Sequence, residues 1–82
     1  MEKQSQIIVY ATRWCPDCLR ARRLLDQKGI QYQLIDIDRD PLAKEYVMKI
    51  NHGNRSVPTI IFPDGSILVE PSNTELSVKI SQ

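Results

Sequence analysis

Two cysteines, Cys15 and Cys18, stand between a strand-like stretch and a helix-like stretch of the chain. The apolar run 7–11 leads into the pair, and a pattern with helical spacing over 19–28 follows it. Pro16 suits the first position of a helix, because that position needs no amide donor and already requires the backbone angle that proline imposes. The sequence therefore predicts that Cys15 lies just past the end of a strand, where a helix begins.

This position has a chemical consequence for Cys15. The free backbone N–H groups of a first helical turn favour a thiolate over a thiol, which makes the cysteine nucleophilic near neutral pH. Cys18 lies about one turn further along, within reach of a small disulfide ring. Strand, Cys-x-x-Cys and helix in this order indicate reversible thiol–disulfide exchange. The alternatives are two buried structural cysteines or half of a zinc site, although the chain has no further cysteine and only His52 as a histidine.

The remaining pattern predicts one small α/β domain over residues 1–82. Strand, helix and parallel strand form a right-handed unit, and a second helix, a hairpin and a last helix follow it. Asp40 and Pro41 are suited to open the second helix, and Ser72 with Glu75 has the spacing of a capping box. The expected order is βαβαββα, with strands at 6–12, 32–37, 57–62 and 67–70 and helices at 15–28, from 40 to 50, and from 71 onward.

Charge and hydropathy exclude several classes of function. The formal net charge is +1, which gives no argument for nucleic acid or an anionic membrane as a partner. No apolar stretch approaches the roughly 20 residues needed to span a bilayer, and residues 1–6 lack the apolar segment of a signal peptide. We therefore expect a cytoplasmic protein, and in that reducing compartment a cysteine pair is more often catalytic than structural.

Taken together, these motifs resemble the glutaredoxin branch of the thioredoxin-fold family over essentially the whole chain. The matching features are the Cys15–Cys18 motif after the first strand, the segment 56–59 (Ser-Val-Pro-Thr), and a hairpin followed by a last helix at the right distance. Within the branch, the stretches 51–59 and 64–66, together with residues 71–72, are most similar to mycoredoxins, the actinobacterial glutaredoxin-like enzymes. The resemblance implies a thioredoxin-like fold, a four-stranded mixed sheet flanked by helices.

The resemblance also implies a substrate site around the two cysteines. It implies a cis bond between Val57 and Pro58, which would leave the backbone groups of Val57 beside Cys15, free to pair with an extended substrate. The cysteinyl unit of a small thiol would then lie on Val57. Its remote carboxylate would lie near Ser72 and Asn73, where the last helix begins and offers free N–H groups.

Three further residues are candidates for substrate contacts. Arg13 can replace a lysine that many glutaredoxins carry where this chain has Thr12. Trp14 is either a substrate platform at the rim or a plug over the core, and Arg55 either contacts the substrate carboxylate or is an ordinary loop cation. Asp17 replaces the tyrosine common inside the motif, and its charge opposes thiolate formation at the neighbouring cysteine.

Several functions are compatible with these residues. The leading hypothesis is an enzyme without a tightly bound cofactor or metal, a thiol–disulfide oxidoreductase with Cys15 and Cys18 as catalytic residues. It would act on mixed disulfides between target proteins and a low-molecular-weight thiol (glutathione, mycothiol or bacillithiol), with protein disulfides as a second class of substrate. A disulfide reductase would be a further partner, and the enzyme would be a monomer. The first alternative is a protein-disulfide reductant recharged by a thioredoxin reductase, for example an electron donor to ribonucleotide reductase. The second is a module that binds an iron–sulfur cluster.

Overall fold

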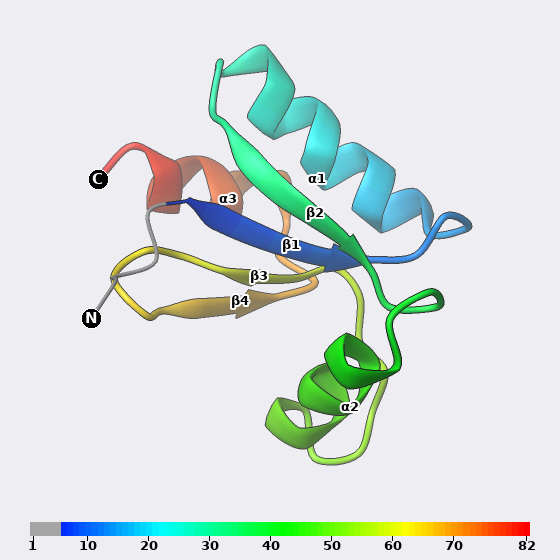
Figure 1. The fold of residues 1–82 in the computed structure, drawn as a ribbon. Helices are drawn as coiled ribbons and strands as arrows, with labels where there is room; N and C mark the ends of the chain where they lie inside the picture. Colours follow the sequence, from blue (N-terminus) through cyan, green and yellow to red (C-terminus); the bar gives the residue numbers. More distant parts are fainter. Residues whose placement is uncertain (1–5) are drawn as a thin grey trace.

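The computed structural model describes residues 6–82, arranged as one four-stranded sheet with helices on both faces (Figure 1). The prediction that residues 1–6 lack a signal-peptide segment concerns mainly residues 1–5, and these lie outside the described part of the chain. The elements in chain order are β1 (Ile7–Ala11), α1 (Pro16–Gln27), β2 (Tyr32–Asp36), α2 (Pro41–Ile50), β3 (Thr59–Ile61), β4 (Ile67–Val69) and α3 (Asn73–Ile80). This is the predicted order, βαβαββα.

The sheet is mixed and has the strand order β2-β1-β3-β4. β1 runs parallel to β2, in a register that pairs Val9 with Leu34, and antiparallel to β3, in a register that pairs Val9 with Ile60. The hairpin of β3 and β4 is antiparallel. β1 and β3 are thus central, and the predicted parallel pairing of the first two strands is confirmed.

Two cores lie on opposite faces of the sheet, because successive strand residues point to opposite sides. On one face, α1 and α3 cover Val9 and Ile60, and on the other face α2 covers Tyr10 and Ile61 (Figure 1). The first core includes Leu25 of α1. Both faces of β1 are therefore covered, which fits the unbroken apolar run of its sequence.

Helix boundaries follow local capping chemistry. The Asp40 side chain accepts a hydrogen bond from the amide of Ala43 at 3.0 Å, which caps α2. Ser72 and Glu75 form the predicted capping box at α3, where the hydroxyl accepts from the Glu75 amide at 3.1 Å and the carboxylate accepts from the Ser72 amide at 2.8 Å. Helix starts could thus be predicted from residues three positions apart.

Two details differ from the sequence prediction. The strand expected over 57–62 begins only at Thr59, which pairs with Tyr10, because Pro58 has no amide N–H for the ladder. The apolar spacing over 41–50 predicts an apolar face of α2 that includes Leu42, but the Leu42 side chain is 78% exposed. That part of the prediction is wrong, because the sheet is covered by the face of α2 that carries Ala43 and Val47.

Candidate active site

Cys15 is the N-cap of α1 and follows β1 after a short link. Its backbone is extended, and its sulfur accepts a hydrogen bond from the Cys18 amide at 3.1 Å. Pro16 occupies the first turn of the helix, as predicted. The sulfur therefore lies at the positive end of the helix dipole, in contact with one of its free amides, and both features stabilise a thiolate.

Cys18 has a different environment from Cys15, although it is only one turn away. Its side chain is 1% exposed, whereas Cys15 is half-buried, and both cysteines are free thiols in this structure. Burial, together with its hydrogen bond to Cys15, raises the pKa of Cys18 to about 12. A hydrogen bond with the Thr12 backbone opposes that rise. Near neutral pH, Cys18 is therefore a protonated, shielded thiol beside an accessible one.

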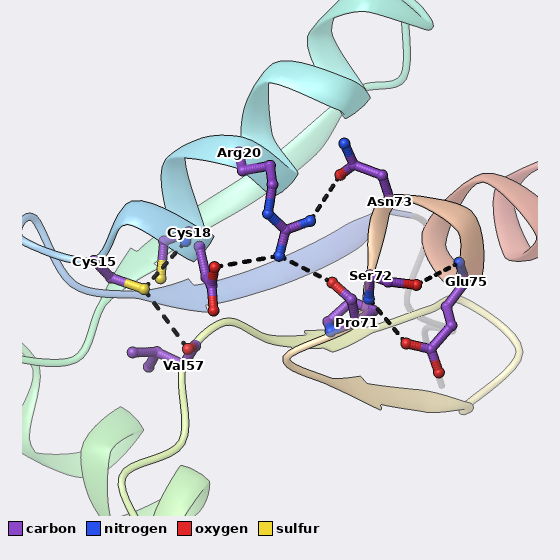
Figure 2. A network of polar contacts seen from close by, with 9 residues as sticks. Cys15, Cys18, Arg20, Val57, Pro71, Ser72, Asn73 and Glu75 are labelled. Carbon is purple, nitrogen blue, oxygen red and sulfur yellow. Dashed lines mark hydrogen bonds and ion pairs between the residues drawn. The ribbon is translucent and has the colours of Figure 1, made fainter.

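Val57 lies directly against the accessible sulfur. The Cys15 thiol donates to the Val57 carbonyl oxygen with a distance of 3.6 Å between the heavy atoms, and the two residues are 42 positions apart in the chain (Figure 2). The bond between Val57 and Pro58 is cis, as the family resemblance predicted. Within residues 6–82, the Val57 amide has no hydrogen-bond partner. An extended substrate that reaches Cys15 would meet an unpaired backbone donor there.

Trp14 and Arg13 form the rim beside Cys15. The Trp14 side chain is 82% exposed, so it lies at the rim and does not plug the core. The guanidinium carbon of Arg13 lies 5.8 Å from the centroid of the Trp14 ring, within the range of a cation–π contact.

Arg55 is exposed and lines a shallow groove of about 280 Å³ together with Thr12, Asp38 and Val57. The structure thus brings Arg55 to the Val57 side of the site. Asp36, at the end of β2, accepts from the Asp38 amide at 2.9 Å and pairs with Arg39 at 3.8 Å. These contacts give Asp36 a role in the local structure at the strand end.

Ser72 and Asn73 lie at the start of α3, where several of their polar groups are already engaged (Figure 2). The hydroxyl and the amide of Ser72 both belong to the capping box with Glu75. The side-chain oxygen of Asn73 accepts from Arg20 at 2.7 Å. A substrate carboxylate at this helix start would therefore compete with Glu75 for the Ser72 amide.

Arg20 connects the cysteine helix to this second region. Its guanidinium donates to Asn73 and, at 3.2 Å, to the Pro71 carbonyl oxygen, and it pairs with Asp17 at 3.4 Å (Figure 2). Pro71 and Asn73 are 51 and 53 positions away along the chain. No local sequence signal can reveal contacts over such a separation.

Within residues 6–82, no three side chains of His, Cys, Asp or Glu gather in a way that could hold a metal ion. None of the helices between residues 6 and 82 is long and apolar enough to cross a bilayer.

Comparison with known proteins gives the family. The family model described as Glutaredoxin matches residues 7–67, which is most of the chain. The chain belongs to the glutaredoxin family. It is 43% identical over 76 residues to mycoredoxin 1 of Corynebacterium glutamicum, an alignment that covers 93% of this chain and 94% of the relative.

Solved structures agree with the fold. A glutaredoxin from Archaeoglobus fulgidus superposes with a TM-score of 0.79 at 24% identity, covering 94% of this chain and 87% of that one. The NrdH-redoxin of Escherichia coli superposes with a TM-score of 0.75 at 23% identity, covering 89% of this chain and 92% of that one. The protein has the thioredoxin-like fold of the glutaredoxins, and with its adjacent cysteine pair it is a thiol–disulfide oxidoreductase.

Proposed function

We propose that this glutaredoxin reduces mixed disulfides between target proteins and a low-molecular-weight thiol. The observation that carries the proposal is the environment of Cys15, an accessible sulfur at a helix N-terminus, 3.6 Å from the backbone oxygen of Val57. Arg13, Trp14, Arg55 and the backbone of Val57 beside Pro58 would bind the small thiol, with Ser72 and Asn73 at its remote end.

The first step is the attack of the Cys15 thiolate on the small-thiol sulfur of the mixed disulfide. A new disulfide forms between Cys15 and the small thiol, while the old S–S bond breaks and the target cysteine leaves as a thiolate that takes up a proton from water. The unpaired Val57 amide supplies a donor for the backbone of the cysteinyl unit, which orients that sulfur toward Cys15.

The second step restores Cys15, and two routes are open. In one route, a second molecule of the small thiol attacks the Cys15 adduct and leaves as a symmetric disulfide. In the other route, Cys18 loses its proton and attacks the Cys15 sulfur, which releases the small thiol with that proton and closes the Cys15–Cys18 disulfide. A disulfide reductase would then return both cysteines to thiols and so restore Cys15. Burial raises the pKa of Cys18 most and persists in the adduct, but the further increases from the hydrogen bond and the charge of Cys15 are lost when Cys15 is blocked, which eases the deprotonation of Cys18.

Single-cysteine variants test the proposal. Cys15→Ser should abolish all exchange, whereas Cys18→Ser should still turn over mixed disulfides but lose the reduction of ordinary protein disulfides. The second cysteine is needed only where a trapped protein adduct must be released. The assay would compare mixed disulfides of glutathione, mycothiol and bacillithiol with an intramolecular protein disulfide. Equal loss of both activities in both variants would contradict the proposed mechanism.

The same assays separate the alternatives. A reductant recharged by thioredoxin reductase would turn over with that enzyme and NADPH, and would not need a small thiol. A cluster-binding module would be coloured when freshly purified, and we expect colourless protein. We also propose that the enzyme acts as a monomer in the cytoplasm, which sedimentation and cell fractionation can test.

A further inference from the structure

The positive charge of the protein is concentrated around the cysteines. Residues 13–26 contain four arginines and two aspartates, a net charge of +2, whereas the whole chain carries +1. Arg20 is paired with Asp17. Within the described residues, Arg13, Arg22 and Arg23 form no salt bridge with a carboxylate. Two cations in the groove of the reacting sulfur, Arg13 and Arg22, and a third further along α1, Arg23, are thus not paired with a carboxylate of the described chain.

Two shallow grooves lie along α1 and share Pro16 and Leu19 in their linings. The first groove, of about 300 Å³, includes Cys15, Trp14 and the cations Arg13 and Arg22. The second, of about 370 Å³, continues along the helix past Arg20, Arg23 and Leu24 to Asn73. Among residues 6–82, no aspartate or glutamate lines either groove.

Apolar side chains lie between these cations. Leu19 is 46% exposed where the grooves meet, and the Trp14 ring stands beside it at the rim. Arg22 is half-buried, and within the described residues its buried Nε has no hydrogen-bond partner. Because a partly desolvated cation is screened less by water and salt, it attracts a carboxylate more strongly than a fully exposed one.

We propose that these two grooves dock an acidic segment of the target protein beside its reacting cysteine. Apolar side chains of the segment contact Leu19 and Trp14, and its carboxylates lie among Arg13, Arg22 and Arg23. This inference rests on the proposed function, since it describes the target protein whose mixed disulfide reacts at Cys15. Charge complementarity of this kind acts chiefly on the association rate and on its dependence on salt.

Two peptides that differ only in charge test the inference. Each carries one cysteine as a mixed disulfide with the same small thiol, flanked by four glutamates in one peptide and by four lysines in the other. At low ionic strength, we expect kcat/KM to be about tenfold higher for the acidic peptide, with the ratio falling toward one in 0.5 M NaCl.

Two charge reversals provide the matched comparison. Arg23→Glu should remove most of the preference, because Arg23 is exposed in the second groove. Lys49→Glu makes the same change of charge on α2, on the other face of the sheet, and should leave the ratio of the two peptides unchanged. Circular dichroism would check that both variants are folded.

A symmetric disulfide of the small thiol, which has no peptide, distinguishes the possible failures. Equal rates on both peptides, or equal effects of the two charge reversals, would overturn the docking inference, while turnover of the small disulfide would leave the proposed function standing. No turnover of any of the three substrates would overturn both.

Discussion

At the scale of single residues, the two cysteines of one motif differ because the helix presents them to different surroundings. Cys15 is at the N-cap, where the helix dipole and an amide stabilise negative charge on its sulfur. Cys18 is one turn inside, between the helix and the sheet, where burial disfavours that charge. In the proposed mechanism, this difference in position sets the order of attack, first Cys15 and then Cys18.

Alkylation across a range of pH should reveal this difference. With the reduced protein, we expect iodoacetamide to label Cys15 first at every pH below about 10, because the pKa of Cys18 is raised to about 12 and the thiolate is the reactive form. As pH rises toward 12, Cys18 ionises and its labelling increases. Peptide mapping by mass spectrometry gives the alkylation rates of Cys15 and Cys18. Preferential labelling of Cys18 at low pH would contradict the assignment of Cys15 as the more reactive thiol.

At the scale of elements, helix ends provide a test of local backbone strain. His52 follows α2 with φ +55°, a left-handed conformation that glycine adopts without strain, whereas Gly29 follows α1 with φ +69°. His52→Gly should raise the free energy of unfolding by about 0.5–1 kcal/mol, and Gly29→Ala should lower it by about 1 kcal/mol. An added Cβ at Gly29 meets no atom within 4 Å, so that loss would come from the backbone alone. Urea unfolding measures the free energy of unfolding of both variants. Changes of the same sign for His52→Gly and Gly29→Ala would contradict the argument from backbone strain.

The contact between α1 and α3 can be measured as a coupling energy. Arg20 donates to the Asn73 side chain at 2.7 Å, so the effects of Arg20→Met and Asn73→Ala should not add. We expect a coupling of about 0.5–1.5 kcal/mol from urea unfolding of the two variants and their combination. Arg23→Met combined with Asn73→Ala is the control, because no hydrogen bond joins that pair and their effects should add.

At the scale of the whole molecule, stability depends on which apolar side chains are buried in the two cores and which remain exposed to solvent. Leu25 is completely buried between α1 and the sheet, whereas Leu42 on α2 is 78% exposed. Leu25→Ala should lower the free energy of unfolding by about 2–5 kcal/mol, a large part of the 5–15 kcal/mol typical of a domain. Leu42→Ala removes the same atoms and should change it by less than about 0.5 kcal/mol. Similar losses in thermal or urea unfolding would show that the second core extends to Leu42.

Much of this molecule could be predicted because its strongest signals are local. The strand before Cys15, the helix that Pro16 opens, the Asp40 cap and the capping box of Ser72 and Glu75 all depend on residues within a few positions of one another. The βαβ handedness and the hairpin then leave few ways to arrange the strands. The cis bond at Pro58 was implied by the family resemblance, and local propensity did not require it.

Tertiary structure alone decided which side chains meet across the fold. It placed the Val57 carbonyl 42 residues away against the Cys15 sulfur, directed Arg20 to Asn73 and Pro71, and left Leu42 exposed although the next residue, Ala43, is buried. The physical reason is that periodicity identifies an apolar face only to within about one residue, and contacts between distant segments depend on how those faces pack. The amino-acid sequence by itself therefore determined where the reactive sulfur sits on its helix, and packing decided what surrounds it.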